Sequence, residues 1–222
     1  MNDSTRPEVN AVSIDPDTGH GVVVERLFAP AVSFVFGAAD RPNEMTIGVA
    51  TWILGDSPNF NPQAEELPQL VLPPVGSTEY ASSPARVVVA AEGRDARIAH
   101  SIIRLLNPEN VTIELVHVTW LPGIAASPID ASGIDNPGHQ DLLMYDGARE
   151  ALIERASELR EAGFRVTTHL RLARHPADAI VAHLQDRPVQ LFVLGLGRHG
   201  AGIGRDVMRA NPLPLLFVNA RG

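Results

Sequence analysis

Apolar runs and amphipathic segments alternate along residues 86–222. Segments rich in apolar and β-branched residues predict strands over 86–92, 111–118, 164–172, 189–195 and 214–218, and the uninterrupted apolar runs of the first and fourth indicate that these two are buried. Apolar residues at helical spacing predict helices over 95–106, 140–162, a segment starting at Pro176, and 202–211. This alternation predicts an α/β fold, a five-stranded parallel sheet with right-handed crossovers and helices on both faces.

Local signals mark several ends of these elements. Asn107 and Pro108 should stop the first helix, Gly163 suits the C′ position of the second, and Pro176 suits the first turn of the third. About twenty residues, 119–139, form a loop that is long for a compact domain, and such loops are often functional or face a partner.

Residues 1–85 have a different pattern, in which prolines are frequent and no helical period is present. Short β-branched or aromatic runs predict strands over 21–28, 31–36 and 45–54. Residues 56–84 are expected to be mostly loop, with Leu70-Val-Leu-Pro-Pro as their apolar part. We therefore expect a β-rich, proline-rich N-terminal arm and linker over 1–85 and an α/β domain over 86–222.

The composition excludes several classes of chemistry. The 222 residues are 45% hydrophobic but only 5% aromatic, which indicates an Ala/Val/Leu/Ile core. Without cysteine there is no disulfide, thiolate metal site or cysteine nucleophile. All 18 basic residues are arginine, so Walker-type phosphate binding and Schiff-base chemistry, which need lysine, are excluded.

Charge and hydropathy bear on location and partners. The net charge of −8 argues against nucleic acid as the main partner. The polar N-terminus shows no signal peptide, and no apolar run approaches the ~20 residues that span a bilayer. We expect a soluble cytoplasmic protein without a transmembrane segment, and the lysine-free, Ala/Arg/Pro/Gly-rich composition suggests a high-GC bacterial genome.

Four segments of residues 86–222, in order, resemble the universal stress protein family. They are Arg86-Val-Val-Val-Ala-Ala-Glu92-Gly93, Arg174-His-Pro-Ala-Asp-Ala-Ile180, Gln190-Leu-Phe-Val-Leu-Gly195 and Leu213-Pro-Leu-Leu-Phe-Val218. The resemblance implies a Rossmann-like fold of the adenine nucleotide alpha hydrolase-like type, with strand order 3-2-1-4-5. It also implies that Glu92, at the end of the first strand, faces an adenine. The alternative role for Glu92 is to favour the dipole of the following helix.

A glycine-rich stretch, 191–204, has the strand–turn–helix pattern that offers backbone N–H groups to a phosphate. ATP-binding members of the family have Gly-x2-Gly, nine residues, then Gly-Ser/Thr. Here Gly197 and Gly200 fit the first pair, but Ala201 and Gly202 stand where the second should fall, so the nine-residue connector is missing. Residues that could contact a nucleotide, in this shortened and vestigial site, are Glu92, Gly195, Gly197, Arg198, Gly200 and Gly202. The alternative is that the glycines only allow a tight turn.

The histidines indicate neither a metal site nor catalysis. His139, His169 and His183 share no ligand spacing, and His117 within an apolar strand suits the core or its rim. His175 and Asp178, beside Pro176, fit helix capping and dipole stabilisation better than a catalytic pair, because no nucleophile is indicated nearby. We predict no metal, no catalytic residue and no enzymatic activity. A slow ATPase or a nucleotidyl transferase would need a group of acid/base or metal-binding residues, and the sequence does not indicate one.

Two hypotheses about function follow. The first is a non-catalytic accessory or interaction subunit, without cofactor, that docks through residues 1–85 on a larger assembly. Its contact residues would be Val22, Val24, Phe34, Phe36, Ile47, Trp52 and Leu54. The alternative is an adenine-nucleotide-binding stress or regulatory protein that holds ATP or AMP at 195–204. The N-terminal strands could also fold back onto the domain or form a small sheet of their own. The strand at 214–218 could pair in a homodimer, unless the N-terminal strands cover it.

Overall fold

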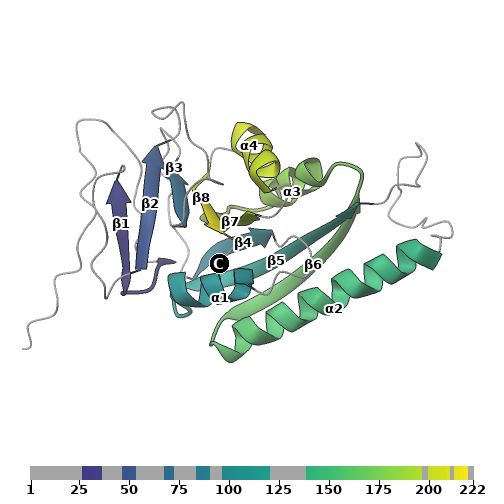
Figure 1. Cartoon of the computed structure of the whole chain (residues 1–222), viewed down its shortest axis with the longest axis horizontal. Helices are drawn as coiled ribbons and strands as arrows, with labels where there is room; N and C mark the ends of the chain where they lie inside the picture. Colours follow the sequence, from purple (N-terminus) through teal and green to yellow (C-terminus); the bar gives the residue numbers. More distant parts are fainter. Residues whose placement is uncertain are drawn as a thin grey trace, which may run out of the picture.

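The structure is a computed structural model that describes residues 27–36, 47–53, 68–72, 84–90, 97–120, 139–196, 200–210 and 213–219. Its strands form one eight-stranded sheet in the order β1-β2-β3-β8-β7-β4-β5-β6 (Figure 1). The strands are β1 (Val32–Phe36), β2 (Ile47–Ile53), β3 (Gln69–Leu72), β4 (Ala85–Ala90), β5 (Val111–Trp120), β6 (Arg165–Ala173), β7 (Leu191–Leu196) and β8 (Leu215–Asn219).

The five strands expected for residues 86–222 are all present and parallel. They lie in the order β6-β5-β4-β7-β8, so the expected order 3-2-1-4-5 and the Rossmann-like fold are confirmed. β4 is central, and its Val88 lies between Glu114 of β5 and Phe192 of β7. Val88 and Phe192 are fully buried, as expected for the middle of a sheet covered on both faces.

Four helices of the described residues cover the two faces of this sheet (Figure 1). They are α1 (Arg97–Leu105), α2 (His139–Glu161), α3 (Pro176–Gln185) and α4 (Gly200–Ala210). Buried residues of α1 and α2 share one core with the sheet, and those of α3 and α4 share a second core on the opposite face. None of the described helices is long and apolar enough to cross a membrane.

The N-terminal strands continue the same sheet beyond β8. β3 pairs antiparallel with β8, while β2 and β1 follow in parallel. β3 thus covers the edge of β8 that could otherwise have paired with a second copy of the chain, and of the alternatives for these strands, folding back onto the domain is the one observed within the described residues. Leu70 and Leu72 are buried in the core that α1 and α2 share, so this part of the arm is built into the domain.

Two expectations for residues 1–85 need correction. Gln69–Leu72 is a strand, although we expected mostly loop, because β2 and β8 supply backbone partners on both of its sides. Leu27 and Phe28, at the end of the strand expected over 21–28, lie in a short turn and an isolated antiparallel bridge to Leu106. Residues 21–26 lie outside the described part of the chain.

The helix ends follow the local signals closely. Gly163 has φ of +94°, and α2 closes with hydrogen bonds from Gly163 N to Arg160 O (2.9 Å) and from Phe164 N to Leu159 O (3.0 Å). This is the Schellman pattern, which needs a residue that tolerates positive φ. Pro176 opens α3 as expected. β5 continues two residues beyond its expected end, to Trp120, and α4 begins two residues earlier than expected, at Gly200.

Candidate functional site

The expected nucleotide site lies where β4 and β7 end, the switch point of the sheet, because β4 pairs with β5 on one side and with β7 on the other. Gly195 is the second-last residue of strand β7, whereas Gly200 and Gly202 are in the first turn of α4. The structure therefore brings these three glycines to one strand–helix connection. Glu92, Gly197 and Arg198 lie outside the described residues.

Two glycines near this connection have a packing reason. A Cβ added to Gly204 would lie 2.6 Å from Cε1 of Phe217 and 3.1 Å from Cδ2 of Leu194, so α4 approaches the sheet too closely for any side chain there. A Cβ on Gly195 would lie 3.2 Å from Cδ1 of Ile98. At Gly204, close packing is therefore sufficient to explain glycine without a ligand, whereas at Gly195 the Ile98 methyl group would have to shift by only a few tenths of an ångström.

The residues expected to contact a partner are only partly described. Phe34 and Phe36 belong to β1, and Ile47 and Trp52 to β2. The structure therefore places the backbone of these four residues in the two strands farthest from the α/β strands in the sheet order. Val22, Val24 and Leu54 lie outside the described residues.

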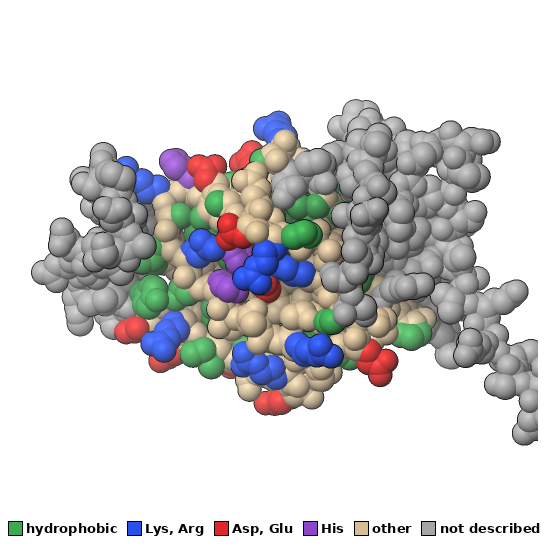
Figure 2. All heavy atoms as spheres, turned by 180° about the vertical axis from the view of Figure 1, so that it is seen from behind, with side chains coloured by type: hydrophobic (Ala, Val, Ile, Leu, Met, Phe, Trp, Pro, Cys, Tyr) green, Lys and Arg blue, Asp and Glu red, His purple; other side chains and the backbone are tan. Residues whose placement is uncertain are grey.

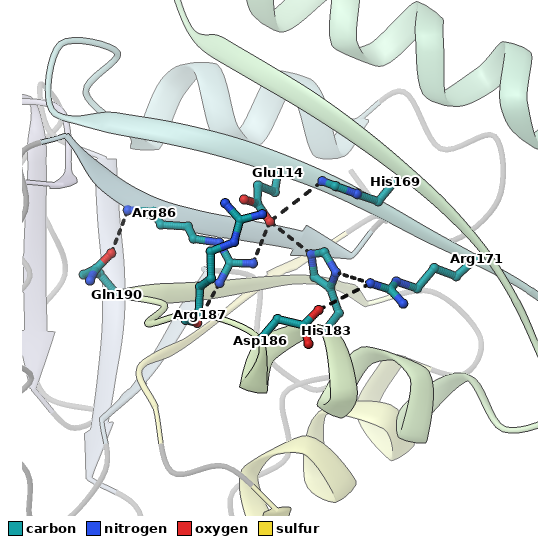
Figure 3. A network of polar contacts seen from close by, with 8 residues as sticks. All are labelled: Arg86, Glu114, His169, Arg171, His183, Asp186, Arg187 and Gln190. Carbon is teal, nitrogen blue, oxygen red and sulfur yellow. Dashed lines mark hydrogen bonds and ion pairs between the residues drawn. The ribbon is translucent and has the colours of Figure 1, made fainter. Parts of the chain in front are cut away.

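A polar cluster that the sequence did not predict lies on the sheet face covered by α3 (Figure 3). At its centre, Oε2 of Glu114 in β5 accepts hydrogen bonds from the Arg86 guanidinium of β4 (2.7 Å) and from Nε2 of His183 in α3 (3.0 Å). Glu114 and His183 are buried. Because a buried carboxylate is expensive unless it is paired, these two hydrogen bonds are what allow Glu114 to occupy the middle of a sheet.

The hydrogen bonds fix the protonation of His183. NH2 of Arg171 lies 3.0 Å from Nδ1 of His183, and because a guanidinium can only donate, Nδ1 must accept. The ring proton is therefore on Nε2, which donates to Glu114. Burial lowers the pKa of His183, and the neighbouring His169 and Arg171 act in the same direction. His183 is thus a neutral imidazole with both nitrogens engaged.

Glu114 is held as a carboxylate. The hydrogen bond from Arg86 lowers the pKa of Glu114 to about 2, with further contributions from the charge of Arg86 and from His183, although burial acts in the opposite direction. Nε2 of a second histidine, His169 of β6, lies 3.9 Å from Oε2 of Glu114, and the two imidazole rings are 4.8 Å apart between centroids.

Further contacts tie the cluster to the chain that follows α3. NH1 of Arg86 donates to the carbonyl of Arg187 (2.7 Å), and the Arg86 backbone N–H donates to Oε1 of Gln190 (2.6 Å). NH2 of Arg171 also lies 3.6 Å from Oδ2 of Asp186, an exposed pair. The space-filling view shows arginine, histidine and acidic side chains gathered near the middle of one face (Figure 2). The cluster thus joins three strands to the C-terminal end of α3.

The cluster and the glycines lie toward opposite ends of the strands. Glu114 is near the start of β5, and His183 is in the last turn of α3, whereas Gly195 is near the end of β7. His175, expected to cap α3, occupies its N-cap position but makes no side-chain cap hydrogen bond, while Asp178 is in the first turn as expected. One signal could have indicated the cluster: a lone Glu between Ile113 and Leu115, in a strand of mostly apolar residues, requires a partner if the strand is buried.

The stability of the protein should fall in acid because of this cluster. In metal-free buffer, the free energy of unfolding by urea should decrease as the pH falls from 4.5 toward 2. Over this range the unfolded Glu114, with its ordinary pKa of 4.5, binds a proton before the folded one, whose pKa is about 2. The expected loss is about 3 kcal/mol. A smaller loss should begin below pH 6.5, since the pKa of His183 is also lowered on folding.

The Glu114→Gln variant is the control for this pH dependence. It keeps the size of the side chain and one acceptor oxygen but has no carboxyl to titrate, so its stability should change less between pH 4.5 and 3 than that of the native protein. An acid-induced loss of equal size in both proteins would show that Glu114 is not its source.

No protein-family model and no curated protein sequence matches the chain. Among solved structures, the chain is similar to a universal stress protein from Archaeoglobus fulgidus in complex with dAMP, at 24% identity and a TM-score of 0.42, covering 60% of this chain and 96% of that one. It is similar to an Arabidopsis thaliana family protein with AMP bound (19% identity, TM-score 0.41, 61% and 92% covered). A Burkholderia pseudomallei family protein has 15% identity and a TM-score of 0.40 (61% and 96% covered). Over about three fifths of its length, the chain is therefore similar to universal stress protein structures, the family that its sequence motifs resemble.

Proposed function

We propose that the protein is a non-catalytic interaction subunit that pairs its outer strand, β1, with an extended segment of a protein partner. The observation that carries this proposal is the pairing of β3 with β8. It builds the inner N-terminal strands into the sheet and makes β1, the first strand in the sheet order, an edge of the sheet within the described residues. An edge strand offers backbone N–H and C=O groups to an added strand.

The sequence of β1 supports this role. Val-Ser-Phe-Val-Phe is rich in the β-branched and aromatic residues that favour strands. Among the described strands β1 pairs only with β2, in register from Val32 with Ile47 to Phe36 with Thr51. Strand addition at such an edge would gain affinity from backbone hydrogen bonds and specificity from alternate side chains.

The absence of catalysis in this proposal is supported by the state of the polar cluster. A general base works best when its pKa is near the working pH, and a pKa of about 2 makes Glu114 a weak one. Both ring nitrogens of His183 are engaged by Glu114 and Arg171. The chain also has no cysteine to act as a nucleophile.

Site-specific photo-crosslinking tests the interaction. Because the chain has no cysteine, Ser33→Cys in β1 gives one attachment point for a thiol-reactive crosslinker. The matched control is Ser157→Cys, an exposed position of α2. In extracts of the native cells, a discrete adduct should form from position 33 and not from position 157. Equal adducts from both positions, or none from either, would overturn the proposal.

Binding of an adenine nucleotide at 195–204 is the second candidate function. It is favoured by the position of the glycines at the switch point between β4 and β7. β7 ends at Leu196, and α4 begins only four positions later, at Gly200. ATP or AMP at 100 times its Kd should stabilise the full chain by about 2.7 kcal/mol in thermal unfolding. Gly200→Ala should abolish that shift. No shift at millimolar nucleotide would remove this candidate.

A further inference from the structure

Three groups that can ligate a metal ion converge in the polar cluster. Glu114, His169 and His183 each offer one ligand atom, and these atoms lie within 4.8 Å of one another. Nε2 of His183 is 3.0 Å and Nε2 of His169 is 3.9 Å from the same carboxylate oxygen. Ligand atoms around a tetrahedral Zn²⁺ are about 3.3 Å apart, so the Glu114–His183 pair already has suitable spacing, and His169 must approach by no more than roughly 1.5 Å.

The donor set selects the kind of ion. Two imidazole nitrogens and one carboxylate oxygen suit Zn²⁺ and related first-row transition metals, whereas Ca²⁺ and Mg²⁺ prefer oxygen ligands alone. We propose that Glu114, His169 and His183 form a binding site for Zn²⁺ or a related first-row divalent cation, with water as the fourth ligand. This site is separate both from β1 and from the connection between β7 and α4, where the nucleotide was expected.

The three ligand residues differ in burial, so two are held rigidly and the third is accessible to solvent. The side chains of His183 and Glu114 are 4% and 10% exposed, so packing holds two of the three ligands in place. The side chain of His169 is 35% exposed, which gives an ion access from solvent and gives this ligand room to move. A site with two fixed ligands and one adjustable ligand can therefore close around an ion without moving the strands.

Metal binding requires a change of tautomer at His183. The ion takes the place of the proton that Nε2 now donates to Glu114, and the neutral ring keeps one N–H by carrying it on Nδ1 instead. Arg171, which now donates to Nδ1, must then turn away. Asp186 is available to receive it, since its Oδ2 is 3.6 Å from the same guanidinium nitrogen. Arg86 can stay, because a carboxylate has about four acceptor sites.

Arg171 therefore opposes the ion in two ways, by its charge and by its hydrogen bond to Nδ1. It follows that removing a positively charged neighbour outside the ligand set should strengthen binding of the ion. Arg171→Gln should bind the ion more tightly than the native protein. A loss of structure around α3 could only weaken binding, so the direction of this change separates a metal site from a purely structural cluster.

The test is titration of the full chain, without an affinity tag and stripped of metal by a chelator, with Zn²⁺ by calorimetry and with Co²⁺ by visible absorption. We expect one ion per chain and the strong absorption bands of tetrahedral Co²⁺. His169→Ala, at a half-exposed position, should weaken binding by about 100-fold or more. The matched control His175→Ala, an exposed histidine at the start of α3, should leave it unchanged.

Three results would overturn the proposal. They are no saturable binding of either ion, binding that His169→Ala leaves unchanged, and weaker binding by a folded Arg171→Gln variant. The second result would identify an adventitious surface ion. These outcomes do not depend on β1 or on nucleotide binding, so the metal site can fail while the proposed interaction holds.

Discussion

Removal of residues 1–83 should prevent the rest of the chain from folding as a stable monomer. The deletion takes away β1, β2 and β3, and with β3 the antiparallel partner of β8. It also removes six buried apolar side chains, which are Leu27, Phe28, Val49, Leu70, Val71 and Leu72. At about 2 kcal/mol for each buried side chain, the loss is roughly 12 kcal/mol, similar to the whole stability of a typical domain.

The described contacts of residues 27–29 add to this loss. The backbone N–H of Ala29 donates to Leu105 O, and that of Asn107 donates to Leu27 O, each at 2.8 Å. These bonds satisfy backbone groups at the end of α1, where carbonyls otherwise have no partner. The deletion therefore affects the α/β domain at two places, the β8 edge and the end of α1.

Circular dichroism and light scattering of the truncated chain measure this effect. We expect loss of cooperative unfolding, or association of copies through the freed β8 edge. Leu70→Ala in the full chain is a milder test and should cost about 2–5 kcal/mol. Its matched control is Ile153→Ala, at an exposed position of α2. A truncated chain that stayed monomeric with native stability would show that the arm is not part of the core.

The fold of residues 86–222 could be predicted because its signals are local. The central strands β4 and β7 contain uninterrupted apolar runs, and Gly163 and Pro176 mark helix ends by their own backbone preferences. β3 could not be predicted in this way. It has four residues, begins with a polar Gln69 and is followed by two prolines, and its pairing comes from β2 and β8. Gln69 is fully buried, and its side-chain amide has no hydrogen-bond partner among the residues that the structure describes.

The candidate site shows the same limit more strongly. The glycines at the connection between β7 and α4 could be identified because they are close together in sequence. The polar cluster joins residues that are 28 and 69 positions apart, Arg86 with Glu114 and Glu114 with His183. Spacing rules for metal ligands or catalytic pairs do not apply over such separations. The sequence could indicate that Glu114 needs a partner, but not that α3 would supply it.

Glu114→Ala should destabilise the protein by about 3–5 kcal/mol, the usual effect of removing one partner from a buried ion pair. The Arg86 side chain is only 13% exposed, and its NH2 would lose its acceptor. Nε of Arg86 is already buried without a hydrogen-bond partner in the described part of the chain, so few contacts there would compensate for the lost acceptor. Nε2 of His183, which is also buried, would lose its acceptor as well. Urea unfolding at pH 7 measures the change, and Glu154→Ala, at an exposed position of α2, should stay within about 0.5 kcal/mol of the native protein.

A double-mutant cycle separates the ion pair from the rest of the cluster. If the cost of Glu114→Ala comes mainly from the unpaired charge of Arg86, then Glu114→Ala combined with Arg86→Ala should cost less than the sum of the two single changes, by about 1–3 kcal/mol. Additive losses would mean that each side chain acts through its other contact, Glu114 through His183 and Arg86 through the carbonyl of Arg187. A buried pair is seldom a net source of stability compared with apolar residues, so strong coupling would indicate that the cluster serves to fix the position of α3 on the sheet.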